Sequence, residues 1–527
     1  MGTMVDGAGE DRGEMLTRDA SRAPRHNPAL RGEAADATVV PIPRGDDIEL
    51  AAARGDAAQV VSLIDASPIE AWFAVPPDRM LEILSGLSPS AMHGSGAVHA
   101  FRLLLQSDPV EPGESGDGWR ALGELGGGFF DARVHGQPLR AAAVLDRGGE
   151  VVTRTNALFD ETAGWRAFIA VQTGIQSILA GEYAAALAAF SHAVTAPPPR
   201  TLAVLYRDAM VKGALVHALF GDPAAARRDL DVAATVVRTQ SWAEAIVDAH
   251  AEIAEAVLLA DTLPDAAIDR LEHVPIALVG ELWPLRLLAT ATVYLRAGRP
   301  DAGRRRIDEL DHFPAQATDG LPRVAPALAR SAIALIEADF IAAADVIAAD
   351  PGTVVVDTGL VRAVLDLVAG DEDAAILRLT GLGPRTAGLS RLEAGRTIAL
   401  AWALLRKGDE KAAEQTLRAL REREGADMPL PLAVPQEIHR FAVARVPGWP
   451  VEAPIGFVSD AEPRPRLTEG ERRLLPLLAA GLTREQMASE LFVSVNTVKT
   501  QQRSLFRKLG VSSRVDALVV ADRLQLI

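Results

Sequence analysis

Basic, amide and hydroxyl side chains gather in one stretch near the C-terminus, "VSVNTVKTQQRSLFRKLGVSSRVDAL", residues 493–518. Lys499, Arg503 and Arg507 recur every four residues there, so on a helix they form one stripe. Asn496, Thr500 and Gln502 flank that stripe. Cations can neutralise phosphates, and amides or hydroxyls can hydrogen-bond to base edges. The pattern therefore predicts a helix that enters the major groove of duplex DNA.

A small helical module must position this stripe. Val498, Leu505 and Leu509 recur at roughly helical spacing on the other side of the same stretch, so we expect them in a core. Phe492–Val493–Ser494 predicts the short turn of a helix-turn-helix. Helix start signals divide the module into four helices, and they are the boxes Thr468/Glu471 and Thr483/Gln486, the cap Ser494, and Ser512 or Ser513. Gly481 is expected to end the first helix.

Charge separates this module from the rest of the chain. Residues 464–527 hold eleven Arg and Lys against six Asp and Glu, a net charge of +5. Because the whole chain carries -16, the other 463 residues carry -21. The tail should therefore attract a polyanion that the body repels.

The module resembles the LuxR-type (NarL/FixJ-like) helix-turn-helix domain, a four-helix unit. The resemblance covers about Leu467 to Ile527 and rests on "LTEGE", "LLAAG", "TREQMA", "VSVNTVK" and "RKLGVSSRVDA", in that order. It implies a sequence-specific DNA-binding regulator whose third helix carries the recognition residues.

The resemblance also implies roles for individual residues. The positions that match Lys499, Thr500 and Arg503 face bases or groove phosphates in that family. Those that match Ser494, Thr497 and Arg514 lie near the DNA backbone or hold the turn. The last helix often pairs two copies, which implies a homodimer on DNA through faces such as Val515, Val519 and Asp522. The full set of predicted DNA-binding residues is Ser494, Asn496, Thr497, Lys499, Thr500, Gln502, Arg503, Arg507 and Arg514.

Three positions depart from the family pattern. Gln501 stands where the family often has His, and Gly470 replaces a commoner charged residue. Pro476 lies inside the first helix, where it should kink the helix or remove a hydrogen bond.

A turn followed by an Ala-rich helix recurs through residues 46–445. The phrase starts at Gly181, Gly221, Gly298, Gly370 and Gly408, with degenerate copies at Asp261 and Ala338, so its period is near 38 residues. Two helices per unit at this period indicate a helical solenoid that resembles tetratricopeptide repeats. Together with the C-terminal module, this body resembles the large LuxR regulators.

The predicted fold class is therefore all-α, with four segments. They are a disordered leader at 1–45, a repeat body for sensing or interaction at 46–445, a Pro-rich linker at 446–466 and the helix-turn-helix domain at 467–527.

Several function classes have no support in the sequence. The chain has no cysteine and no Gly-Lys dipeptide, so thiol chemistry, a cysteine metal site and a Walker A nucleotide loop are excluded. We see no zinc-type His motif and no catalytic constellation, and we expect no cofactor, no metal and no enzyme activity. The absence of a signal peptide or membrane span predicts a cytoplasmic protein. The LuxR-type resemblance implies a bacterial one.

The main hypothesis is a transcriptional regulator that binds double-stranded DNA and responds to a protein or small-molecule effector on the repeat body. The alternative is a helical-repeat interaction scaffold whose C-terminal module only dimerises.

Overall fold

The computed structural model confirms an all-α protein over the residues that it describes. These are 39–92, 95–105, 129, 132–133, 136–147, 164–195, 198–310, 317–337, 339–340, 342–344, 355–425, 428–432, 434–451, 469–509, 511 and 513–523. Every named element within these ranges is a helix, and the extended backbone recorded there is an isolated bridge between Val40 and Thr239. Most of the expected leader and linker lies outside these ranges, as does the degenerate repeat start at Ala338.

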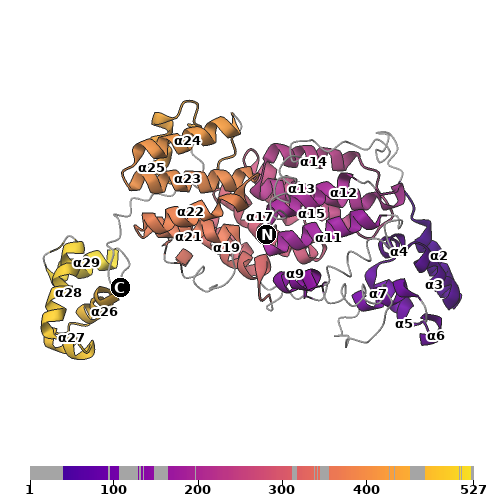
Figure 1. Ribbon diagram of the computed structural model, residues 1–527, viewed down its shortest axis with the longest axis horizontal. Helices are drawn as coiled ribbons and strands as arrows, with labels where there is room; N and C mark the ends of the chain where they lie inside the picture. The colour runs from indigo at the N-terminus through magenta and orange to yellow at the C-terminus, as the bar shows by residue number, and fades with distance from the viewer. Residues whose placement is uncertain are drawn as a thin grey trace, which may run out of the picture. The chain divides into compact units, whose positions relative to one another are not determined.

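The helices follow the chain in four groups (Figure 1). The N-terminal group is α2 (Pro43–Ala53), α3 (Ala57–Ala66), α4 (Pro68–Ala74), α5 (Pro77–Ser85), α6 (Pro89–Met92) and α7 (Gly96–Leu105). The second is α9 (Pro138–Arg147), α11 (Trp165–Ala180), α12 (Tyr183–Thr195), η2 (Arg200–Leu202), α13 (Ala203–Phe220), α14 (Pro223–Thr235), α15 (Glu244–Leu259), α16 (Pro264–Glu272), η3 (Ile276–Leu278), η4 (Gly280–Leu282), α17 (Trp283–Arg296), α18 (Pro300–Leu310) and α19 (Gly320–Ile336). The third is α21 (Val356–Val368), α22 (Glu372–Thr386), α23 (Ser390–Arg406), α24 (Glu410–Glu424) and α25 (Gln436–Arg445). The last is α26 (Glu469–Ala479), α27 (Arg484–Glu490), α28 (Val495–Lys508) and α29 (Arg514–Arg523).

The chain divides into two compact units. Unit 1 comprises Met1–Ile333, Ala348–Thr358 and Pro384–Glu393, and unit 2 comprises Ala334–Ile347, Gly359–Gly383 and Ala394–Ile527. This division cuts across the repeat body expected at 46–445, and the four predicted segments stay predictions.

The recurring Gly phrase lies at the turn between two helices, as its composition predicts. Gly181, Gly298, Gly370 and Gly408 all have positive φ, between 67° and 87°, where glycine meets no Cβ penalty. Gly221 is the exception, with φ of -110°. The Asp that follows a turn Gly caps the next helix at three of these sites: Asp222 accepts from the Ala224 amide, Asp371 from the Ala374 amide, and Asp409 from the Ala412 amide.

Neighbouring helices in unit 1 pack in a regular order. α11, α13, α15 and α17 each contact the next in that series, and α12, α14 and α16 each contact the helices before and after them. A solenoid requires contacts of this nearest-neighbour kind. The packing is compatible with the predicted repeat, whose family stays a prediction.

The N-terminal helices have a core of their own and meet the repeat helices through aromatic residues. Ile48, Ile64 and Leu84 are fully buried in that core. The Trp242 indole N–H donates to the Trp72 carbonyl at 2.8 Å, and its ring stacks with Phe73 at 6.2 Å between centroids. The segment 236–243, between α14 and α15, is therefore one point of contact, alongside the contacts of Glu70 with Thr201 and of Phe73 with Phe168.

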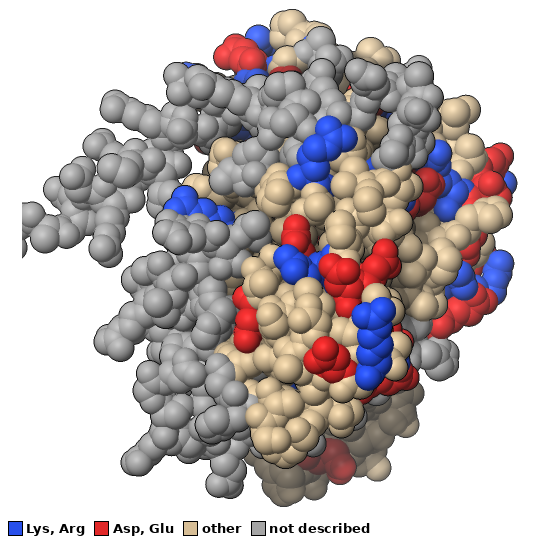
Figure 2. Space-filling view, turned by 90° about the vertical axis from the view of Figure 1, so that its right-hand side faces the viewer, with Lys and Arg blue, Asp and Glu red and all other residues tan. Residues whose placement is uncertain are grey.

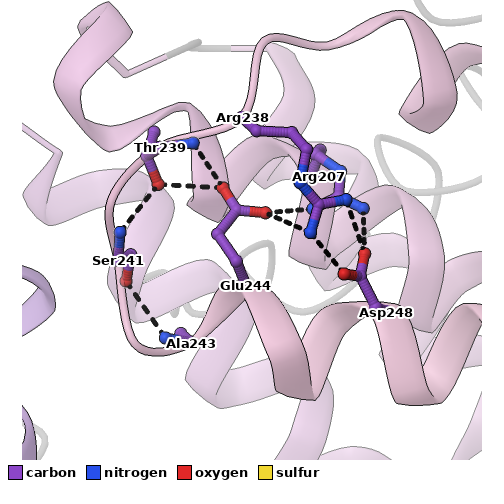
Figure 3. Close-up of polar contacts among 7 residues, drawn as sticks. All are labelled: Arg207, Arg238, Thr239, Ser241, Ala243, Glu244 and Asp248. Carbon is purple, nitrogen blue, oxygen red and sulfur yellow. Dashed lines mark hydrogen bonds and ion pairs between the residues drawn. The ribbon is translucent and has the colours of Figure 1, made fainter. Parts of the chain in front are cut away.

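A partly buried ionic network holds this segment in place (Figure 3). The Glu244 carboxylate, at the start of α15, accepts from the Thr239 amide and hydroxyl, both at 2.8 Å, and pairs with Arg207. Arg207 and Arg238 both pair with Asp248. Partial burial works to raise the pKa of Asp248, but hydrogen bonds from Arg238 and Arg207 outweigh it and lower that pKa, so the carboxylate stays ionised.

The same segment also binds extended chain from before α2. The Val40 N–H donates to the Arg238 carbonyl at 2.7 Å, and the Gln240 N–H donates to the Val40 carbonyl at 2.9 Å. Glu244 thus anchors, through one loop, both the N-terminal helices and the chain that leads into them.

Acidic and basic side chains are interspersed on the face where α2–α7 lie (Figure 2). Arg79, for example, pairs with Glu49 at 2.9 Å and with Glu82 at 2.8 Å. Among the described residues, none of the helices has the length and apolarity that a membrane span requires.

Candidate nucleic-acid interface

α27 and α28 form the predicted helix-turn-helix, and their caps explain where each helix begins. Thr483 and Gln486 make the predicted reciprocal capping box at the start of α27. The Ser494 hydroxyl accepts from the Thr497 amide at 3.1 Å and caps α28 as predicted. The residue at which α28 begins is therefore set by this cap. If the helix were inserted into a groove, this end would meet the base edges.

Of the remaining helix boundaries predicted for the module, those at Gly481 and Ser513 are confirmed. Gly481 ends α26 as predicted: with φ of 82°, it lets the Leu482 amide reach the Leu477 carbonyl. Ser513 caps α29 by accepting from the Asp516 amide at 3.1 Å. Thr468 and Ser512 lie outside the described residues. α26 runs through Pro476 to Ala479, with the proline exposed to solvent.

The turn itself requires unusual backbone geometry at Phe492. Its φ is 55°, a left-handed value. Among the described residues, all others with a positive φ are glycines. The Val493 amide then bonds back to the Ala488 carbonyl at 3.0 Å. The Phe492 side chain is 96% exposed, so the turn leaves an aromatic ring beside the start of α28.

One face of α28 holds it in the module. Val498, Leu505 and Leu509 are buried, which confirms the predicted core face. They pack in one cluster with side chains of the other three helices, namely Leu474, Leu475 and Leu478 of α26, Met487 and Ala488 of α27, and Ala517 and Ala521 of α29. The module has a hydrophobic core of its own, and Figure 1 shows its four helices packed together.

The opposite face of α28 presents the predicted cations to solvent. Lys499, Arg503 and Arg507 are all exposed, and so are Asn496 and Thr500. At 100° per residue these five positions span one side of the helix, opposite Val498 and Leu505. This face can therefore offer positive charge and hydrogen-bonding groups to a groove without disturbing the core.

Three of the predicted DNA-binding residues, those with hydroxyl groups, also have local structural roles. The Thr500 hydroxyl donates to the Asn496 carbonyl at 2.9 Å. The Ser494 and Thr497 hydroxyls lie 2.8 Å apart at the helix start. Each hydroxyl oxygen keeps acceptor capacity, but these side chains are oriented by the cap and by the helix backbone.

Gln502 does not lie on the exposed face. It is 8% exposed, and its Oε1 accepts from the Arg484 Nε–H at 2.7 Å. Arg484 is the first residue of α27 and is exposed. Sequence patterns do not single it out, because one arginine at the start of a seven-residue helix forms no stripe.

Arg514 holds the end of α26. Its Nε donates to the Leu478 carbonyl at 3.1 Å, and its Nη1 donates to the Leu482 carbonyl at 2.9 Å. The guanidinium therefore gives the Leu478 carbonyl a donor in addition to the Gly481 amide, and it ties the end of α26 to the carbonyl of Leu482 just beyond it. This geometry supports the turn-holding part of the role that the family resemblance implies.

Replacing Arg514 with Ala should lower the stability of the module more than it lowers the module's affinity for DNA. Loss of these charge-assisted hydrogen bonds is expected to cost about 2–3 kcal/mol of unfolding free energy. Arg514→Lys should restore part of it, because an ammonium cannot span both carbonyls as a planar guanidinium does. Thermal unfolding measures the loss, with Arg503→Ala as a control whose stability should be near that of wild type. A stable Arg514→Ala protein with a reduced salt dependence of DNA binding would contradict this role.

α26 and α28 are also joined by an ion pair and by a tight contact. The Glu471 carboxylate, buried near the start of α26, pairs with the Lys508 ammonium at 2.7 Å. Gly470 and Gln501, two of the three positions that depart from the family pattern, lie against each other: a Cβ on residue 470 would approach Gln501 Cδ to 3.0 Å. The absence of a side chain at 470 thus leaves room for the end of the Gln501 side chain.

These features define a compact helix-turn-helix module with a cationic outer face. Comparison with known proteins identifies its class: residues 465–521 match the model of bacterial regulatory proteins of the luxR family. The predicted resemblance is confirmed for this segment, which is a LuxR-family helix-turn-helix domain.

Two curated relatives share this domain. The HTH-type transcriptional regulator MalT of Yersinia enterocolitica is 45% identical over 58 residues, which is 11% of this chain and 6% of that protein. The transcriptional regulatory protein LiaR of Bacillus subtilis is 40% identical over 68 residues, which is 13% of this chain and 32% of that protein. The similarity thus spans less than two thirds of either relative. No solved structure matches the chain.

Proposed function

We propose that the protein is a cytoplasmic, sequence-specific DNA-binding transcriptional regulator that inserts α28 into the major groove. The observation that carries the proposal is the exposed row Lys499, Arg503 and Arg507, which lies opposite a buried face in a LuxR-family domain. Cations of this row neutralise phosphates, while Asn496 and Thr500 are placed to meet base edges. The two relatives are both named as transcriptional regulators, which supports the same function.

We propose that two copies bind a roughly two-fold symmetric site through α29. Val515 is 70% exposed on that helix, which leaves an apolar side chain available to a partner. The side chains of Val519 and Asp522 lie outside the described residues. A symmetric site would follow from the symmetry of the dimer.

We also propose that an effector on the repeat body controls the module. The support is the charge difference between the net +5 of residues 464–527 and the -21 of the remainder. An acidic body repels DNA, so it should weaken binding until a protein or small molecule occupies it.

Selection of fragmented genomic DNA by the full chain and by residues 464–527, at two salt concentrations, tests these proposals together. The module's own core supports the use of the fragment. Enrichment of one short symmetric motif by both proteins is expected, with stronger enrichment by the fragment. Equal enrichment would remove the inhibitory role of the body. If neither protein enriches a sequence, the regulator proposal fails and the interaction-scaffold alternative takes its place.

A further inference from the structure

We infer that Arg484, at the start of α27, is a further DNA-backbone contact, and that Gln502 positions it. The inference rests on the proposed DNA-binding function and adds a second helix to the interface. It also gives Gln502 a role other than the base contact that its position in the sequence predicts.

The first step is the orientation of the Arg484 guanidinium. Its Nε–H is donated to Gln502 Oε1 at 2.7 Å, so the side chain is held from its inner edge. No acceptor for Nη1 or Nη2 is recorded among the described residues. Those two groups form the planar pair that matches the oxygens of a phosphate.

The second step concerns the position in which Gln502 holds the Arg484 guanidinium. Gln502 comes four residues after the buried Val498 and three after the exposed Lys499, so it lies at the boundary between the core face and the cationic row. Arg484 is therefore held at the Lys499 edge of that row. In a docked helix-turn-helix, the second helix occupies the groove while the first crosses the DNA backbone. A cation from α27 at this edge is placed where a phosphate would pass.

The third step concerns the burial and hydrogen bonding of the Gln502 side chain itself. A side chain that is 8% exposed and hydrogen-bonded to another residue has little surface left for a base. The Arg484 Nε–H instead satisfies the buried Gln502 carbonyl oxygen. This bond fixes the arginine, which lowers the entropy that Arg484 would lose on binding. Gln502 is thus a positioning residue rather than a contact residue.

The test measures how the affinity of the full chain for its selected DNA site depends on salt, between roughly 50 and 200 mM. Each neutralised phosphate contributes about 0.9 to the slope of log affinity against log salt, or about eight-fold in affinity near 0.1 M. Arg484→Ala should therefore reduce the slope by about 0.9 and the affinity by about eight-fold. The preferred DNA sequence should stay the same. Arg484→Lys should keep the slope, because the charge remains.

Gln502→Leu separates positioning from base contact, since it removes the acceptor and keeps the size. It should weaken binding less than Arg484→Ala does, leave the preferred sequence unchanged, and add no further loss when combined with Arg484→Ala. A changed sequence preference would show that Gln502 contacts bases and would overturn its assigned role. Arg227→Ala is the matched control, because it removes one exposed charge from α14 and should leave the slope unchanged.

The outcomes distinguish this inference from the function on which it rests. If wild type shows no salt-dependent binding to any selected site, the proposed function fails and the inference fails with it. If wild type binds and Arg484→Ala keeps the full slope, the inference is overturned alone. A drop in thermal stability with an unchanged slope has the same meaning, since it shows that Arg484 only ties α27 to α28.

Discussion

Replacing Lys499 and Arg503 together with Ala is expected to lower affinity for the selected DNA site at least about 60-fold near 0.1 M salt, with a loss of about 1.8 in the salt slope. Both side chains are exposed on the outer face of α28, so their charge is available to phosphates. Loss of a base contact by either residue would enlarge the effect and relax the preferred sequence. Fluorescence anisotropy with labelled duplex, at several salt concentrations, measures both quantities.

The control for this double variant removes the same charge elsewhere. Arg200→Ala with Arg227→Ala takes two exposed arginines from η2 and α14 and should change neither affinity nor slope by much. Folding should persist in the Lys499/Arg503 variant, because neither residue contributes to the core of the module. Unchanged affinity in that variant would contradict the regulator proposal and favour a module that only dimerises.

Replacing Arg207 with Met should destabilise unit 1 by on the order of 3–5 kcal/mol. Arg207 is 7% exposed and pairs with Glu244, which is 8% exposed. Without the arginine, the Glu244 carboxylate would remain buried with the Thr239 donors and the more distant Arg238, at 3.9 Å, which is a poor substitute. The loop 236–243 would lose its anchor. Amide exchange at Val40 and Gln240 should accelerate, because these two amides make the hydrogen bonds between that loop and the chain before α2.

Native-state hydrogen exchange of the amides in α13 and α15 measures this opening without the assumption of two-state unfolding of the whole chain. The double variant Arg207→Met with Glu244→Gln should recover about 1–2 kcal/mol, since it removes the uncompensated charge while an amide oxygen still accepts from Thr239. Arg227→Ala is the matched control and should stay within about 0.5 kcal/mol of wild type. A cost below about 1 kcal/mol for Arg207→Met would show that the network contributes little.

The parts of the fold that local patterns govern were predictable from the sequence. The helical spacing of Val498, Leu505 and Leu509 gave the core face of α28, because burial follows from periodicity. Thr483 and Ser494 were identified as caps, because a cap acts within three residues of itself. The turn glycines of the repeat were predictable for the same reason.

Long-range contacts were not predictable, and they changed the picture of the site. Gln502 sits only one residue from Arg503 in the chain, yet it faces α27, where its partner Arg484 is eighteen residues away. The contact of Val40 with the loop at Arg238–Gln240 joins segments about 200 residues apart and leaves no periodic trace. Helical periodicity predicts on which face of a helix a side chain lies. Whether that face is exposed to solvent or packed against another helix depends on tertiary contacts, which periodicity does not show.

The contact between Gly470 and Gln501 limits how freely α28 can be exchanged on its own. A designer who grafts α28 from another LuxR-type domain to redirect this protein to a new promoter would import a different residue at 501. A bulkier side chain there would have less room beside Gly470, because a Cβ on residue 470 would already approach the end of the Gln501 side chain closely. The graft would also have to keep an ammonium at 508 for the buried Glu471. Specificity in this module is therefore best transferred by exchanging the outward residues alone, or α26 and α28 as a pair.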